Sequence, residues 1–300
     1  MFEILIFLAS LLAVIKGAQI TTESAINVAK KYGISEFLIG FTVIAVGTSL
    51  PELATSITAV MYGTPDIAVS NIIGSNIANI GLVVGITTIL FSRKVRNGNL
   101  KNDLRFLIFS VLALIFVFRD GMITFQESIS FLVIYFAYII YSVKSRKMKK
   151  RKKEKQELKT SLILIFGLAL LLIGSNYLIS SAISIIDMSG ISAKAFGFFF
   201  IAVGTSLPEL ATSIISIKKK HHNLAIGNII GSNIFNTFLI FGTIGTIKTI
   251  PIIKSFYLET MPILIILTGL LYISAARKKV TRLEGLLFLL IYAVSVIRVF

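Results

Sequence analysis

The chain has 300 residues, of which 55% are hydrophobic and only 15% are charged. Soluble domains carry about 25% charged residues, so this composition indicates a protein embedded in a bilayer and leaves no room for a separate soluble domain. The sequence contains no cysteine, which excludes disulfides, thiol catalysis and cysteine-ligated metal centres. The net charge of +16 would suit a nucleic-acid partner, but the positions of the basic residues argue against one.

Apolar runs of about 20 residues, long enough to cross the hydrocarbon core of a bilayer, recur along the whole chain. We expect ten membrane-spanning helices and therefore an all-α membrane protein. Their approximate ranges are 2–22, 36–62, 67–91, 104–118, 125–143, 160–182, 193–216, 223–247, 256–274 and 282–299.

Basic residues gather in alternate gaps between these spans. Most of the 30 Lys and Arg residues lie at 30–31, 93–105, 144–159, 218–220 and 277–282. Loops on the cytoplasmic side of membrane proteins carry an excess of Lys and Arg. The pattern predicts a multi-pass protein of the cell membrane with cytoplasmic basic loops and with both termini outside. It also explains the net charge without nucleic acid.

One stretch of the sequence occurs twice. Residues 40–56 read GFTVIAVGTSLPELATS, and residues 197–213, 157 positions later, differ from them at only two positions. The same spacing carries the segment NIIGSNI from 71–77 onto 228–234. One ungapped register of this length indicates an internal duplication. Because each copy has five spans, an odd number, the second must enter the membrane from the opposite side, which is the inverted-repeat architecture of secondary transporters.

The duplication divides the chain into three segments. We expect a first repeat at 1–143, a basic cytoplasmic linker at 144–159 and a second repeat at 160–300. The linker is interpreted as a solvated segment that fixes the topology, and attraction to anionic lipid is a supplementary interpretation.

Each copy places a proline and a carboxylate inside an apolar segment. Pro51 lacks an N–H and clashes with the carbonyl four residues earlier, so we expect a kinked or unwound helix around 45–50 and broken helices near the membrane midplane. Such backbone is tolerated at depth only inside protein or beside a wet cavity, where its oxygens can bind a cation. Glu52 and Glu209 are functional candidates because a buried intramembrane carboxylate is costly. Carboxylates with neutral oxygens suit a hard cation such as Ca²⁺, and the absence of Cys and His from the motif argues against zinc or copper.

The third and eighth spans supply further polar groups. Ser75 and Asn79 are four residues apart and share one helix face, as do Ser232 and Asn236. We favour a site-lining role for these two faces. For the remaining asparagines of the duplicated segments, hydrogen bonding between helices is the preferred interpretation. These are Asn71, Asn76, Asn228 and Asn233.

The paired GTSLPE motifs, the paired GSN segments and the five-plus-five layout resemble the sodium/calcium exchangers of the cation/calcium antiporter superfamily, in a prokaryotic form without a regulatory domain. The resemblance covers nearly the whole chain. It implies alternating-access exchange of Ca²⁺ for Na⁺, usually three Na⁺ per Ca²⁺, with the first and sixth spans as a moving gate. Neither an enzymatic activity nor a cofactor nor a protein partner is expected.

The resemblance also implies which residues bind the ions. The calcium site would consist of Glu52 and Glu209 with the carbonyls of Thr48 and Thr205. The flanking sodium sites would draw on Ala45, Ser49 and Ser75 on one side and on Ala202, Ser206 and Ser232 on the other.

The sequence departs from the family at one point. Family members commonly have an acidic residue at one of the positions held here by Asn79 and Asn236. Two core carboxylates neutralise one Ca²⁺ but leave three Na⁺ with a surplus charge of +1, so the stoichiometry and the coupling ion stay open. Lys16, within the first span, is interpreted as a snorkelling lysine. The alternative interpretation is that its ammonium group approaches the ion cavity and substitutes for a cation in part of the transport cycle.

Two other functions remain as alternatives. The first is H⁺-coupled antiport of Ca²⁺ or another cation on the same scaffold, although the retained serines of the motifs favour sodium. The second, less favoured, is a non-transporting membrane sensor or scaffold.

Overall fold

The computed structural model describes residues 2–91, 93–94, 100–146, 157–188, 204, 206–277 and 279–299, and these residues are mostly helical. The symbol η denotes a short π-helical turn. The elements of the first half are α1 (Phe2–Tyr32), α2 (Glu36–Ile39), η1 (Gly40–Ile44), α3 (Ala45–Thr48), α4 (Leu50–Met61), α5 (Pro65–Ala78), η2 (Asn79–Val83), α6 (Val84–Leu90), β1 (Arg93–Lys94), α7 (Leu100–Phe118), β2 (Met122–Ile123) and α8 (Phe125–Ser145). Those of the second half are α9 (Glu157–Met188), α11 (Leu207–Lys218), α12 (His222–Ile234), η3 (Phe235–Ile240), α13 (Phe241–Ile247), β3 (Ile250–Pro251), α14 (Lys254–Ala276), β4 (Lys279–Val280) and α15 (Arg282–Val299).

The described helices are those of a multi-pass membrane protein. Six are long and apolar enough to cross a bilayer, and the bent pair Glu36–Thr48 and Leu50–Met61 makes a seventh if it counts as one span. Both α7 and α15 carry charged residues in their first turns, such as Asp103 and Glu284. The first part of the expected span 193–216 lies outside the described residues. The count of ten spans therefore stays a prediction.

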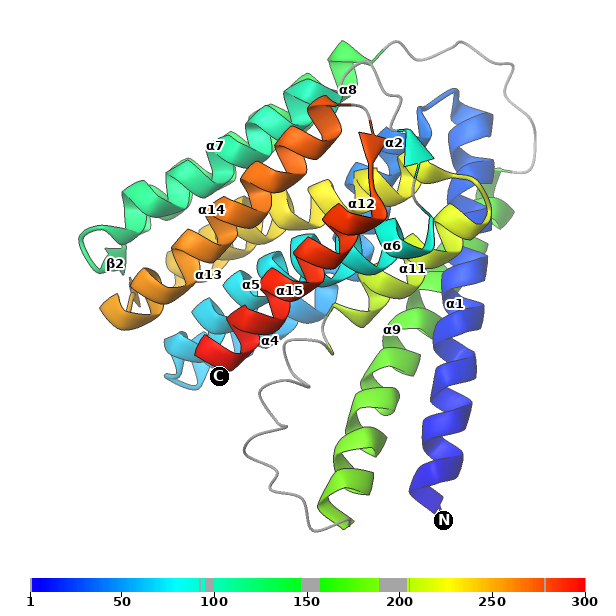
Figure 1. Cartoon of the computed structure of the whole chain (residues 1–300), viewed down its shortest axis with the longest axis horizontal. Coiled ribbons are helices and arrows are strands. Elements are labelled where there is room, and N and C mark those ends of the chain that lie inside the picture. The colour runs from blue at the N-terminus through cyan, green and yellow to red at the C-terminus, as the bar shows by residue number, and fades with distance from the viewer. Residues whose placement is uncertain are drawn as a thin grey trace.

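The two longest composite helices form the centre of the molecule. In the most apolar stretch of each, 89% of the residues of α12–α13 and 72% of those of α5–α6 are buried, against 28% for α1 and for α8. The peripheral helices instead expose large aliphatic and aromatic side chains, as a lipid-facing surface requires. In Figure 1, α1 and α9 run side by side at one margin of the molecule, and these two helices pack closely against each other.

Backbones approach closely where α12 crosses α2 and η1. A Cβ added at Gly227 would overlap the carbonyl oxygen of Phe37, and one added at Gly40 would overlap that of Leu224. Small residues at helix crossings allow such close packing inside membranes. This crossing joins the second half directly to the helix that leads to the bend in the first half.

Two short antiparallel pairs, which the sequence did not predict, connect loops at the ends of the bundle. In one, Arg93 pairs with Val280, and in the other, Ile123 pairs with Ile250. Each pair joins one loop of the first half to one of the second.

Candidate functional site

The second span bends by 42° between α3 and α4. The break is at Ser49, whose φ of −92° and ψ of 11° are not helical, and Pro51 follows in the first turn of α4. The bend thus falls inside the predicted interval 45–50. The Ala45 carbonyl still accepts a hydrogen bond from the Ser49 N–H at 3.1 Å, so the bend does not release this oxygen from backbone hydrogen bonding.

The counterpart of Ser49 in the second half has nearly the same backbone conformation. Ser206 has a φ of −87° and a ψ of 2°, and it immediately precedes α11. Its buried hydroxyl has no hydrogen-bond partner among the described residues. Ala202 and Thr205, which belong to the predicted site, lie outside the described residues.

The two glutamates lie in the first turns of α4 and α11, and both are completely buried. The Glu209 carboxylate connects the two halves: its Oε1 accepts hydrogen bonds from the hydroxyl of Ser49 at 2.9 Å and from that of Ser232 at 3.3 Å. Its Oε2 has no hydrogen-bond partner among the described residues. One buried carboxylate therefore contacts the bend of the opposite half and still has an oxygen available.

Thr48 makes a second link between the halves. Its hydroxyl donates to Oδ1 of Asn228 on α12 at 3.2 Å and lies 3.4 Å from the Ala45 carbonyl oxygen. Together with the Ser49–Glu209 bond, this fixes the end of α3 against α11 and α12. The sequence placed Thr48 and Asn228 in two unconnected motifs and gave no signal that they touch.

Asn79 and Asn236 lie in the π-helical turns η2 and η3, and both are completely buried. Neither the oxygen nor the nitrogen of either amide has a hydrogen-bond partner among the described residues. A buried polar group without a partner costs about 1–3 kcal/mol, so these two amides are candidates to contact a bound ion or water. π-helical turns are frequent at functional sites. Since α11 contacts η2 and α4 contacts η3, these amides lie beside the two glutamate-bearing helices.

The other asparagines mainly bind neighbouring protein groups. Asn71 donates to the Glu52 carbonyl and to the Ser56 hydroxyl, each at 3.1 Å, and so ties α5 to α4. Asn76 donates to the Thr237 hydroxyl at 3.1 Å, and Asn233 to the carbonyl four residues before it at 2.8 Å. Each of these amides, like that of Asn228, therefore has one atom bonded to protein and one buried atom without a partner among the described residues, whereas Asn79 and Asn236 have two such atoms each.

Two further residues of the predicted site, Ala45 and Ser75, lie inside the bundle. Ala45 and Ser75 are completely buried, on α3 and on α5, the helix that η2 continues. In the part of the chain that the structure describes, no three His, Cys, Asp or Glu side chains gather into a metal-binding group. The predicted site would combine two carboxylates with neutral oxygens, a donor set that suits hard cations. The Lys16 side chain is exposed on α1, which argues against the interpretation that its ammonium group approaches the ion site.

A second buried charged cluster was missed by the sequence reasoning. Arg146, assigned to a solvated linker, is buried: its Nη2 binds Oδ1 and Oδ2 of Asp103 at 2.7 and 2.6 Å. The Tyr138 hydroxyl donates to the same carboxylate at 2.8 Å. The guanidinium also lies 4.8 Å from the ring centre of Phe37 on α2. The one available signal was an acidic residue, Asp103, among the basic residues that precede the fourth span. Residues 147–156 of the linker lie outside the described part.

A family model for the sodium/calcium exchanger protein matches residues 2–144 and 159–300. The chain belongs to the sodium/calcium exchanger family. Proteins of this family are transporters, not enzymes.

Individual relatives align with this exchanger over nearly its whole length. Sodium/calcium exchanger MaX1 of Methanosarcina acetivorans is 32% identical, and the alignment covers 99% of this chain and 98% of MaX1. The uncharacterized membrane protein MJ0091 of Methanocaldococcus jannaschii is 33% identical, with 97% and 95% covered. A solved structure of the sodium-calcium exchanger NCX_Mj, soaked with Na⁺ and Sr²⁺, is similar with a TM-score of 0.89 at 31% identity and covers 99% of this chain and 98% of that one.

Proposed function

We propose that this exchanger-family protein is a secondary antiporter that exchanges Ca²⁺ for Na⁺ across the cell membrane by alternating access. The observation that carries the proposal is the buried Glu209 carboxylate of the second half, hydrogen-bonded to Ser49 at the bend of the first. A cation at this point touches oxygens from both halves. Its binding free energy can therefore change how the halves are placed against each other, as ion-driven transport requires.

Glu52 and Glu209 form the Ca²⁺ site of this proposal. The carbonyls of Thr48 and Thr205 complete its oxygen shell, because Ca²⁺ takes 6–8 oxygen ligands. The Na⁺ sites lie on either side of it. They are composed of Ala45, Ser49 and Ser75 in the first half and Ala202, Ser206 and Ser232 in the second. Asn79 and Asn236 contribute amide oxygens or orient a bound water between the two sets.

The charge of the site limits what can bind together. Two ionised carboxylates match one Ca²⁺, and they also match two Na⁺. Since Asn79 and Asn236 are neutral, a third Na⁺ would leave an uncompensated positive charge in a buried site, which is unfavourable. We therefore infer that fewer than three Na⁺ occupy the site simultaneously.

The proposed architecture is ten spans in two inverted repeats, 1–143 and 160–300, joined by the basic linker 144–159. Corresponding elements support it: α4 and α11 begin at equivalent positions of the duplication, as do α5 and α12, and each of the latter continues through a π-helical turn. Both termini lie outside, and the basic loops face the cytoplasm and its anionic lipids. The α1–α9 pair is the part that moves across the two halves.

The test is uptake of ⁴⁵Ca²⁺ into proteoliposomes of the purified protein, driven by an outward Na⁺ gradient. We expect uptake that needs internal Na⁺ and persists when the pH is clamped. Parallel vesicles with an outward H⁺ gradient and with K⁺ in place of Na⁺ serve as controls. Uptake driven by H⁺ and indifferent to Na⁺ would instead establish the proton-coupled alternative. Vesicles that take up no Ca²⁺ under any gradient would refute antiport.

A further inference from the structure

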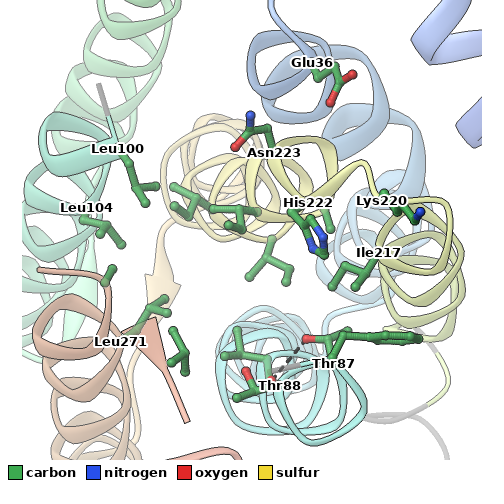
Figure 2. A pocket seen from close by; sticks show the side chains of 18 residues that line it. Glu36, Thr87, Thr88, Leu100, Leu104, Ile217, Lys220, His222, Asn223 and Leu271 are labelled. Carbon is green, nitrogen blue, oxygen red and sulfur yellow. Dashed lines mark hydrogen bonds between the residues drawn. The ribbon is translucent and has the colours of Figure 1, made fainter. Parts of the chain in front are cut away.

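A separate cavity lies at the end of the bundle that carries the basic loops. Neither Glu52 nor Glu209 lines it. It has a volume of about 240 Å³ and opens between α6, α7, α11, α12 and α14. Figure 2 shows aliphatic side chains such as Leu100, Leu104 and Leu271 on one side of it. Polar side chains lie opposite. They are Glu36, Thr87, Thr88, Lys220, His222 and Asn223.

The apolar side of this cavity fits a hydrocarbon chain. Val84, Ile226, Ile229 and Ile230 add to the leucines, so most of the lining is aliphatic. An apolar cavity of roughly 150 Å³ already holds benzene, and natural ligand sites combine apolar walls with a few polar groups that fix orientation. An inorganic ion would lose its hydration in such a space, which is unfavourable. An alkyl chain gains by leaving water for it.

The polar side of the cavity carries one cationic and one acidic side chain, Lys220 and Glu36. Lys218 ends α11, the residues Lys219, Lys220 and His221 form the connection to α12, and His222 begins α12. Two of these contact carboxylates: Lys219 binds Glu23, and Nδ1 of His221 lies 2.9 Å from Oε1 of Glu36. The acidic residue of the lining, Glu36, thus already has a polar partner in His221. Lys220 forms no ion pair with any described residue, and its ammonium can serve an anionic group.

The backbone of Lys220 gives an independent indication. With a φ of 69°, it is the one non-glycine residue of the described chain in the left-handed region. The equivalent position of the first repeat is Gly63, which has a φ of 80°. Glycine adopts this conformation without steric cost, whereas a side chain makes it unfavourable. A strained residue that lines a cavity is a reason to look for function there.

We propose that this cavity binds a single-chain anionic amphiphile, with the alkyl chain between α6, α7, α12 and α14 and a carboxylate or phosphate head against Lys220. The proposal concerns a site distinct from the proposed ion site and does not depend on antiport. A free fatty acid and a lysophospholipid share this chemistry, and both occur in membranes.

The test is binding of radiolabelled dodecanoate to the purified full-length protein, kept in a steroid-based detergent that has no alkyl chain. We expect saturable binding of about one molecule per chain, without competition from dodecanol, which has the same chain and no charge. Dodecanoyl-lysophosphatidic acid and unlabelled dodecanoate are compared as competitors. Stronger competition by the first indicates a preference for a phosphate head group, and stronger competition by the second a preference for a carboxylate. Binding that does not saturate, or equal competition by dodecanol, would overturn the proposal.

Three variants locate the site. Lys220→Gly should lower affinity about tenfold, the usual effect of one charge-assisted contact, while it raises the Tm because backbone strain is relieved. Lys218→Gln removes a charge at the end of α11, outside the cavity lining, and should bind as the wild type does. Ala275→Phe fills the cavity and should abolish binding. Equal affinities of the Lys220→Gly and Lys218→Gln variants would contradict the site, and so would wild-type binding by a folded Ala275→Phe protein.

Discussion

At the scale of single residues, the hydrogen bond from Ser49 to Glu209 links the bend of the first half to the buried carboxylate of the second. Glu209→Gln keeps the shape of the side chain but removes a charge that Ca²⁺ needs. We expect exchange to fall at least about 100-fold, because a buried divalent ion then has only one carboxylate.

Ser49→Ala removes one hydrogen bond to a charged group, worth about 1.5–3 kcal/mol, and should reduce exchange roughly tenfold or more.

Gradient-driven ⁴⁵Ca²⁺ uptake, normalised to reconstituted protein, measures both effects. Ser130→Ala is the matched control, since this exposed serine bonds only to the carbonyl four residues before it on α8. Strong Ca²⁺ transport by Glu209→Gln would show that the proposed site is wrong.

Asn236→Asp tests the charge balance of the site. It adds a third carboxylate beside a glutamate-bearing helix, in a buried position where the amide has no partner among the described residues. The ionised aspartate would accommodate one more Na⁺, and the protonated form would resemble the wild-type amide in charge. We therefore expect uptake by this variant to depend more steeply on internal Na⁺ and to respond to pH in a range where the wild type does not. Identical Na⁺ and pH profiles would mean that this position does not face the ions.

At the scale of elements, the Asp103–Arg146 cluster joins α7 and the end of α8 to α2 through the ring of Phe37. Removing one partner of a buried ion pair costs about 3–5 kcal/mol, because the other charge stays buried and uncompensated. Arg146→Gln should therefore lower the Tm by several degrees. The double variant Asp103→Asn/Arg146→Gln should recover much of the loss, and Arg105→Gln, an exposed change at the same end of α7, should have almost no effect. A Tm of Arg146→Gln equal to that of Arg105→Gln would contradict the cluster's role.

The same elements mark the limit of what the sequence could predict. Apolar run length and proline chemistry are local, so they indicated the helices and the position of the bend at Ser49. The duplication pointed to both glutamates because it repeats them in one register. The Thr48–Asn228 and Asp103–Arg146 contacts join residues that are far apart along the chain, and only the packing of the helices brings them together. The cationic residue of a polar linker can also turn inward, as Arg146 does, when a buried carboxylate lies within reach.

At the scale of the whole molecule, the predicted orientation can be tested because the native chain has no cysteine. Single cysteines at Tyr62, which follows α4 and is 83% exposed, and at Ser145, the exposed last residue of α8, lie at helix ends expected on opposite sides of the membrane. An impermeant maleimide should label Tyr62→Cys in intact cells and Ser145→Cys only after permeabilisation. Labelling of both before permeabilisation, or the reverse order, would contradict the assigned topology.

The packing of α1 against α9 has a consequence for how tightly transport is coupled. A Cβ at Gly17 would overlap the backbone of Leu171, and one at Gly174 would approach Ala13, so each helix fits into the other through a residue without a side chain. We expect helices interlocked in this way to move as one body. If this pair is the moving part, as proposed above, one body would cover the ion site from one side of the membrane at a time, and no continuous aqueous path would form. Slippage, the downhill escape of Ca²⁺ without a counter-ion, should therefore be rare even under steep gradients.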